Sequence, residues 1–126
     1  MKRTISISDA PAAVGAYSQA TTNGDLVLTA GQLPLTPDGE LLDDASVGDQ
    51  TKRCLENVEA ILVSEGGSLD DVLKTTVFLD DIDDFEEFNE VYSEFFDEEP
   101  PARSAVEVGN VPKGAAIEIE AIAATE

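Results

Sequence analysis

The feature that most restricts the fold is one long amphipathic segment set among short β-prone runs. Between residues 46 and 65, apolar side chains recur every three or four positions, which is the period of a helix with one buried face. Gly66 and Gly67 end this segment. A shorter segment with the same period follows at residues 84–96. The sequence therefore predicts two helices, and the remaining apolar residues must lie in strands.

Six short runs have the composition or alternation of strands. They are residues 3–7, 17–21, 26–30, 72–79, 103–108 and 115–123. The resulting order, β-β-β-α-β-α-β-β, mixes hairpins with helical crossovers and is typical of an α+β fold. Two helices cannot cover both faces of such a sheet. We therefore expect a mixed six-stranded sheet with both helices on one face, and an oligomer in which other subunits cover the second face.

The 126 residues fit one domain, residues 1–126. No apolar run approaches the roughly 18 residues that a membrane helix needs. The basic start of the chain, residues 1–6, has no apolar stretch after it, so we read no secretory signal. Cys54 is the only cysteine, which excludes an intrachain disulfide. These features predict a cytoplasmic protein.

The chain is strongly acidic, with 27 Asp and Glu residues against 7 Lys and Arg residues and a net charge of −20. Such a surface repels nucleic acid phosphates and anionic lipids. An acidic chain poor in aromatic residues can be disordered, but the periodic apolar segments favour a packed fold. We therefore interpret the chain as a halophilic protein that folds in high salt, where counterions screen its self-repulsion.

The chain contains no histidine. This excludes a Ser-His-Asp triad, a Cys-His pair and any histidine-ligated metal site. The acidic run at residues 80–84 lacks the spacing of a calcium-binding loop, and we interpret it as a solvated helix start. Catalysis must therefore rely on carboxylates, Arg, Lys, Tyr, Asn, hydroxyl groups or the backbone.

Arg103 is the first candidate for a ligand contact. It follows Pro100 and Pro101 and opens a predicted strand in a chain with few basic residues. Its planar guanidinium group matches a carboxylate with two hydrogen bonds. The alternative is a structural ion pair with one of the many acidic side chains.

Glu118 and Glu120 alternate with apolar residues along the last predicted strand, so both carboxylates face one side of it. A partly buried carboxylate at this place could orient a water molecule or move a proton. The alternative is a solvated strand face.

Tyr17, Asn89 and Gly31 are weaker candidates. Tyr17 is equally a core aromatic, and Asn89 could bind backbone as readily as a ligand. Gly31 follows a strand, where it could bring backbone close to a ligand.

Several segments, in the same order along the chain, resemble one family. They are residues 11–20, 29–34, 74–79, 88–96, 101–108 and 117–123. Together they cover almost the whole chain and resemble the RidA family of reactive intermediate (imine) deaminases, also called the YjgF type. The two C-terminal segments are the most specific part of the resemblance.

The resemblance implies a chorismate-mutase-like (bacillus type) α+β domain that forms a homotrimer. Three subunits would pack their sheets into a central barrel, with the helices outside. Active sites would lie in clefts between subunits, and neither a metal nor an organic cofactor would be needed. A trimer of this kind would cover the exposed sheet face inferred above.

The resemblance also implies roles for single residues. Arg103 would grip the substrate carboxylate, and Glu118 would orient the attacking water and move its proton. Asn89 and Tyr17, the latter from the neighbouring subunit, would line the cleft. The expected hydrolase reaction converts reactive enamines and imines, such as 2-iminobutanoate and 2-iminopropanoate, to 2-keto acids and ammonia.

Two positions depart from the family pattern. Ala30 stands where the family commonly has Ser, which removes a hydroxyl group near the substrate. Ala105 stands where it commonly has Cys. Backbone groups near Gly31 and Ala105 are expected to contact substrate or water, and a backbone contact tolerates Ala. If the family's thiol contributes chemically, the rate or the substrate range of this chain will differ.

Two other functions stay open. One is a non-catalytic protein in which Arg103 holds a small carboxylate such as a 2-keto acid. The other is a ribonuclease or translation inhibitor, labels that the family has also carried. The charge of −20 and the absence of histidine disfavour RNA binding.

The acidic composition generates a prediction about salt. Lowering the salt concentration should lower the melting temperature, because fewer counterions then screen the repulsion among the carboxylates. Thermal unfolding followed by circular dichroism over a salt series measures this. A melting temperature that does not respond to salt would contradict the high-salt interpretation.

Overall fold

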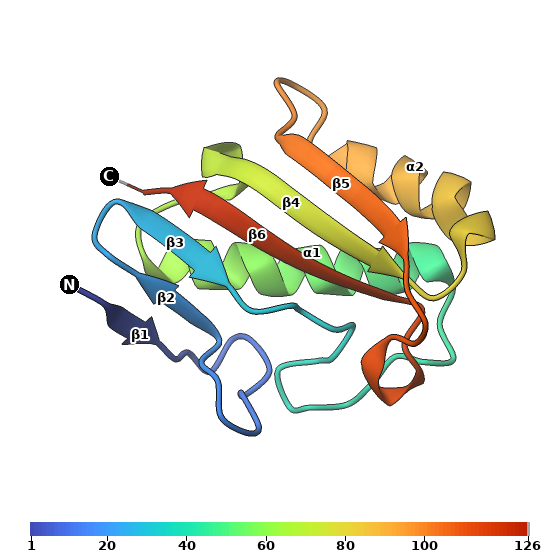
Figure 1. Cartoon of the computed structure of the whole chain (residues 1–126), viewed down its shortest axis with the longest axis horizontal. Coiled ribbons are helices and arrows are strands. Elements are labelled where there is room, and N and C mark those ends of the chain that lie inside the picture. The colour runs from blue at the N-terminus through green and yellow to red at the C-terminus, as the bar shows by residue number, and fades with distance from the viewer. Residues whose placement is uncertain (126) are drawn as a thin grey trace.

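The structure is a computed structural model that describes residues 1–125. Its six strands form one sheet in the order β1-β2-β3-β6-β4-β5 (Figure 1). The strands are β1 (Arg3–Ile5), β2 (Ala20–Thr22), β3 (Leu26–Thr29), β4 (Val72–Leu79), β5 (Ala102–Glu107) and β6 (Ile117–Ala124). Neighbouring strands are antiparallel except β4 and β5, which are parallel. The predicted mixed six-stranded sheet is confirmed.

Both helices lie on one face of this sheet, as predicted. In Figure 1, α1 (Val47–Ser64) lies behind the strands, and α2 (Phe85–Phe95) lies beside β5 at the edge. The Ser46 side chain caps α1 by accepting a hydrogen bond from the backbone N–H of Asp49. Gly66 then takes a φ of 81° just beyond the C-cap, a conformation that glycine adopts without strain. Because β4 and β5 are parallel, they need the crossover that α2 provides.

The buried core lies between the helices and the sheet. Along β6, Ile117, Ile119 and Ala121 are buried against the helices, while Glu118 and Glu120 point to the other side. This is the alternation that the sequence predicts for a strand with one buried face. Phe88 of α2 is the largest of the fully buried side chains in the described residues.

One predicted strand begins later than expected, and the cap of α2 lies one turn earlier than the helix itself. The strand predicted at residues 17–21 begins only at Ala20, and Tyr17 lies in a loop before it. The β1–β2 ladder starts at the pair Ile5–Ala20, so no partner strand is present alongside Tyr17. Asp84 occupies the N-cap position of α2 but makes no side-chain hydrogen bond there. Asp81 instead caps the preceding 3₁₀ turn, Ile82–Asp84.

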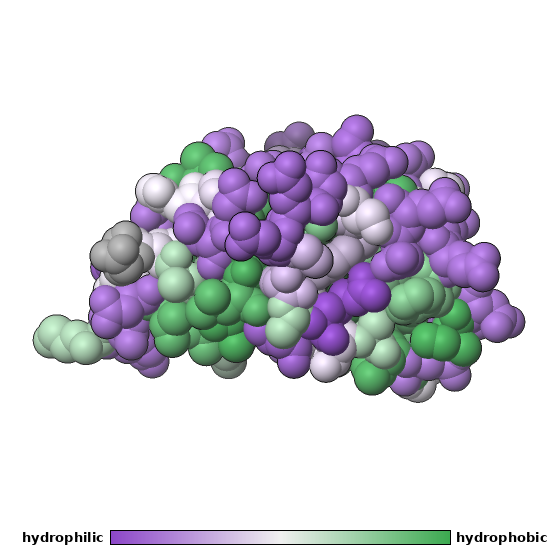
Figure 2. All heavy atoms as spheres, turned by 90° about the horizontal axis from the view of Figure 1, so that it is seen from above, coloured by the Kyte–Doolittle hydropathy of each residue, from purple (hydrophilic) through white to green (hydrophobic). Residues whose placement is uncertain are grey.

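The second face of the sheet is not covered by a helix. Leu28 of β3 and Val106 of β5 point to this face and are each 44% exposed. Figure 2 shows the molecule from above, so the front of Figure 1, where the strands lie, becomes its lower edge. Apolar residues gather along this lower edge. The open face of the sheet therefore carries apolar side chains that residues 1–125 leave accessible. Within residues 1–125, no helix combines the length and the apolar character that crossing a membrane requires.

Candidate active site

Arg103 lies on the helix side of β5, beneath α2. Its Nη1 donates a hydrogen bond to Asn89 Oδ1 at 2.8 Å. The guanidinium carbon lies 4.8 Å from the centre of the Tyr92 ring, 5.3 Å from that of Phe88 and 5.4 Å from that of Phe85. Aromatic faces at these distances attract a cation. Arg103 is therefore held in place by an amide and aromatic rings, with no charged partner in residues 1–125.

The spacing along α2 explains this aromatic setting. Phe85, Phe88 and Tyr92 are three and four residues apart, so they share one face of the helix. The Tyr92 hydroxyl also shares a hydrogen bond of 2.7 Å with the hydroxyl of Thr75 on β4. This bond fixes the ring, and burial raises the pKa of Tyr92. The sequence predicted this stripe as core and did not indicate that it also holds Arg103.

Arg103 makes no ion pair within the described part of the chain. The two ion pairs among residues 1–125 join Arg3 to Glu65 and Arg53 to Glu56. The structural ion pair considered as the alternative for Arg103 is therefore not formed among residues 1–125, although the chain is rich in acidic residues. The guanidinium instead borders a cavity of about 350 Å³ lined by Asn89, Tyr92, Ser93, Phe96, Pro100, Pro101 and Arg103.

Glu118 lies on the opposite face of the sheet, next to Gly31. A Cβ atom added to Gly31 would lie 2.5 Å from Oε2 of Glu118, so the glycine makes room for the carboxylate. Leu28 pairs with Ile122 and Gln32 pairs with Ile119, which leaves one extra residue on the β3 side between these two pairs. Gly31 therefore lies in a β-bulge, a feature that is common beside active sites.

The surroundings of Glu118 favour its protonated form. Burial is the larger cause and the neighbouring Glu120 carboxylate the smaller one, and together they raise the pKa of Glu118. No hydrogen bond to the Glu118 carboxylate comes from any residue in the described range 1–125. A carboxylate with a raised pKa and free oxygen atoms is suited to accept and return a proton.

Tyr17 lies on the same side of the molecule as Gly31. The residue is 55% exposed, and its hydroxyl accepts a weak hydrogen bond of 3.3 Å from the Val14 backbone N–H. Tyr17 and Gly31 line one small hollow together with Pro11, Ala12, Gln19, Gln32, Leu33 and Leu35. We call Tyr17, Gly31 and Glu118 the glutamate cluster.

Asn89 and Ala105 lie with Arg103, and we call these three residues the arginine cluster. Ala105 is two residues beyond Arg103 on β5 and packs against the core on the same side of the strand. Arg103 pairs through β4 with Ala121, three residues along β6 from Glu118. With ordinary strand spacings, the Cα atoms of Arg103 and Glu118 are roughly 14 Å apart, and their side chains leave the sheet in opposite directions.

The family resemblance implies that Tyr17 comes from a neighbouring subunit. Within one chain, Gly31 and Glu118 lie with Tyr17 and away from Arg103. One chain cannot bring its own Arg103 and its own Glu118 into a single pocket. A pocket that contains both residues needs two chains.

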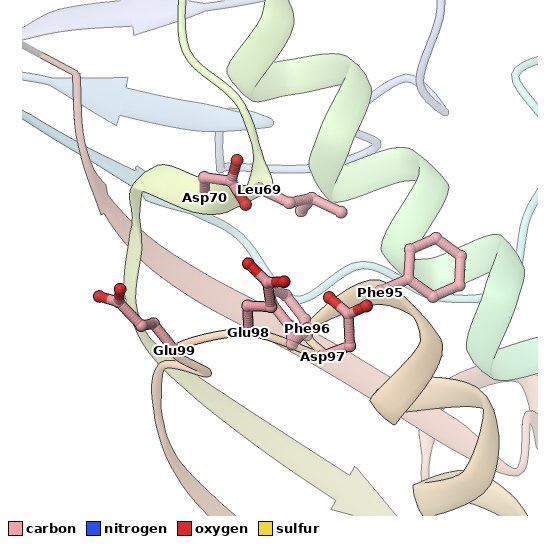
Figure 3. A pocket seen from close by; sticks show the side chains of 7 residues that line it. All are labelled: Leu69, Asp70, Phe95, Phe96, Asp97, Glu98 and Glu99. Atoms are coloured by element: carbon pink, nitrogen blue, oxygen red, sulfur yellow. The ribbon is translucent and has the colours of Figure 1, made fainter.

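A further groove of about 280 Å³ lies between the end of α2 and the 3₁₀ turn Leu69–Asp71 (Figure 3). It is lined by Leu69, Asp70, Phe95, Phe96, Asp97, Glu98 and Glu99. In Figure 3 the carboxylates of Asp97 and Glu98 point toward Asp70, whereas that of Glu99 points away. None of these lining residues is basic, so the groove repels an anionic ligand. It is not a candidate site for a carboxylate substrate.

Comparison with known proteins gives consistent results. The family model described as Endoribonuclease L-PSP matches residues 7–125. A RutC family protein of Pyrococcus horikoshii is 48% identical over 100% of both chains. TdcF of Escherichia coli strain K12, provisionally named a reactive intermediate deaminase, is 47% identical over 98% of this chain and 97% of its own.

Solved structures agree with the fold. The crystal structure of E. coli TdcF with bound serine superposes with a TM-score of 0.91 at 45% identity, covering 98% of this chain and 99% of the other. RidA from the Antarctic bacterium Psychrobacter superposes with a TM-score of 0.91 at 44% identity, covering 97% and 98%. The chain therefore belongs to the RidA/YjgF family, whose family model is described as Endoribonuclease L-PSP.

Proposed function

We propose that the chain is a cytoplasmic imine deaminase that hydrolyses 2-imino acids to 2-keto acids and ammonia. The observation that carries the proposal is the state of Arg103, a half-buried cation that aromatic rings and an amide hold beside an open cavity without an anionic partner in residues 1–125. Such a guanidinium is prepared to bind the carboxylate of a small acid. The serine bound to TdcF, a relative of this chain, is an amino acid with a carboxylate.

We further propose that each active site combines the arginine cluster of one subunit with the glutamate cluster of the next. The two clusters complement each other, because one binds an anion and the other has a carboxylate and an exposed aromatic ring. The uncovered, partly apolar sheet face supports assembly of subunits. The family resemblance implies that three copies assemble.

The proposed reaction needs one water molecule and no outside oxidant. Water adds its oxygen atom to C2 of the C=N bond, and Glu118 accepts a water proton. The electron pair of the C=N bond moves to nitrogen, and Glu118 passes the water proton to it, which gives a carbinolamine. Glu118 then accepts the proton of the carbinolamine hydroxyl and passes it to nitrogen as the C=O bond forms, the C–N bond breaks and ammonia leaves. Arg103 holds C2 beside the water by gripping the adjacent carboxylate, and this positioning supplies much of the acceleration.

Two other functions each have one observation in their favour. The bound serine of TdcF is compatible with a non-catalytic carboxylate-binding protein. The description of the family model favours an endoribonuclease. A net charge of −20 and a chain without histidine disfavour the binding and cleavage of RNA. Ammonia release from imines that an amino acid oxidase generates, compared with cleavage of RNA by the same preparation, distinguishes the three.

Replacement of Arg103 tests whether this residue binds the substrate carboxylate. Arg103→Ala should lower kcat/KM for ammonia release by about 100-fold or more, the equivalent of about 2.8 kcal/mol, because two charge-assisted hydrogen bonds to substrate are lost. Arg3→Ala is the matched control, since it removes the same charge from an exposed ion pair with Glu65. A wild-type protein that binds 2-keto acids without releasing ammonia would instead support the binding function.

Replacement of Glu118 tests whether this residue accepts the proton of water. Glu118→Gln should lower kcat by about 100-fold or more, because the amide cannot accept the proton of water. In the wild type, activity should fall as the pH decreases through the raised pKa of Glu118. Glu120→Gln should move that loss of activity to lower pH, because one cause of the raised pKa is removed. A pH–rate profile that neither substitution changes would exclude Glu118 as the base.

The same raised pKa has a consequence for stability. The folded chain holds the Glu118 proton more tightly than the unfolded chain does. Its contribution to stability is therefore present below the ordinary pKa of glutamate and is lost as the pH rises through the raised value. At neutral pH, Glu118→Gln should raise the melting temperature, and the difference from wild type should disappear in acid. A lower melting temperature at neutral pH would contradict this.

A further inference from the structure

The loop that carries Tyr17 has almost no backbone support of its own. Between Ile7 and Tyr17, the described chain makes no hydrogen bond from backbone to backbone. The loop begins after β1 and ends before β2, so no ladder holds it. Backbone N–H and C=O groups must find other partners wherever they leave water. An exposed aromatic residue in such a loop is not positioned by secondary structure.

One side chain supplies the missing partners. Gln19 is 3% exposed, and its Oε1 accepts a hydrogen bond of 2.7 Å from the Ile7 N–H. Its Nε2 donates to the carbonyl oxygen atoms of Ile7, Ala10 and Pro11 at 3.0, 3.2 and 2.8 Å. The N–H group of Ile7 can only donate, so the Gln19 atom that faces it must be the amide oxygen. This requirement fixes the orientation of the Gln19 amide. Only a glutamine amide combines this reach with both an acceptor and two donor hydrogens.

The backbone of Gln19 makes a second connection. Its carbonyl oxygen accepts a hydrogen bond of 2.8 Å from the N–H of Ala30, the residue before Gly31. Gln19 also lines the same hollow as Tyr17 and Gly31. One buried residue thus joins the loop of Tyr17 to the bulge that accommodates Glu118.

We propose that Gln19 is a positioning residue of the glutamate cluster, which holds Tyr17 in place relative to Gly31 and Glu118. The inference rests on the proposed function and extends it to a residue that does not touch the reacting atoms. Gln19 acts through Tyr17 by tying residues 7–11 to the start of β2.

The test compares Gln19→Met with Gln50→Met. Gln50 is also 3% exposed, and its side chain also bridges backbone groups, the carbonyl of Ala45 and the N–H of Ala116. Both substitutions leave buried backbone groups without partners, so both should lower the melting temperature. Only Gln19→Met should raise KM for the imino acid, by about tenfold, because it displaces a residue that contacts substrate.

A double-mutant cycle separates positioning from stability. When Tyr17→Ala is already present, Gln19→Met should change kcat/KM by less than about twofold, because the residue through which Gln19 acts is gone. The effect of Gln50→Met should be the same with and without Tyr17. Effects of Gln19→Met and Tyr17→Ala that simply multiply would overturn the inference.

Two measurements do not depend on activity. The chain has 2 Tyr and no Trp, so after Tyr92→Phe all tyrosine fluorescence comes from Tyr17. In that background, Gln19→Met should lower the tyrosine anisotropy, and Gln50→Met should not. In the wild type, the Ile7 amide should exchange slowly with solvent although it lies outside a strand. Exchange of the Ile7 amide at the rate of a free amide would overturn the inference. Because this measurement uses the wild type, it applies even if Gln19→Met does not fold.

These results are distinguishable from failure of the proposed function. If the wild type releases no ammonia from any imino acid, the proposed function fails, while anisotropy and amide exchange still decide the role of Gln19. If the wild type is active and the two glutamine variants have the same kinetics, the role of Gln19 is wrong and the deaminase proposal stands.

Discussion

Side-chain alternation along β5 and β6 governs the chemistry available to this protein. Residues opposite one another in neighbouring strands share a face of the sheet, and Arg103 lies opposite Thr75 and then Ala121, on the face that the helices cover. Glu118 differs from Ala121 by an odd number of residues, so it must point to the other face. No rearrangement of side chains within one chain can bring the guanidinium and this carboxylate together. The separation of Arg103 from Glu118 follows from the hydrogen-bonded register of β5, β4 and β6. An active site that contains both residues therefore requires two subunits.

The two faces then provide different environments. On the helix face, three aromatic rings and an amide hold Arg103, and none of the described residues places an acidic side chain in an ion pair with it. On the other face, partial burial and a second carboxylate favour protonation of Glu118. One environment preserves a positive charge for a ligand, and the other keeps a carboxyl group able to exchange protons. In a chain without histidine, the proposed deaminase would use this guanidinium to bind the substrate anion and this carboxyl group to carry the proton.

Periodicity predicted most of the fold. The helix at residues 46–65, the strand at residues 72–79 and the two faces of β6 agree with the structure, because each follows from a repeating burial pattern. The strand predicted at Tyr17 is wrong, because its β-prone residues have no partner strand. Tertiary pairing, which local composition does not encode, decides that segment.

The chemistry of the side chains identified the candidate residues in the sequence. The sequence did not predict which of these residues lie together in the fold. Sequence gives no distance between Arg103 and Glu118, and the bulge at Gly31 depends on the register between β3 and β6. The aromatic face of α2 was predicted as core, which describes its burial but not its contact with Arg103. The sequence indicates only that Gln19 lies two residues from Tyr17. Its four hydrogen bonds to the backbone form when the loop folds, so the sequence does not predict them.

We infer that Arg103 and Glu118 act in one site only when they belong to different chains. The most direct test mixes subunits carrying Arg103→Ala with subunits carrying Glu118→Gln after reversible dissociation. Each variant alone lacks one cluster at every interface, whereas mixed assemblies contain interfaces with both clusters intact. Equal mixing should restore about a quarter of the wild-type rate of ammonia release, since that share of head-to-tail interfaces is intact. Mixed assemblies that are verified by mass spectrometry and show no recovered activity would contradict the account.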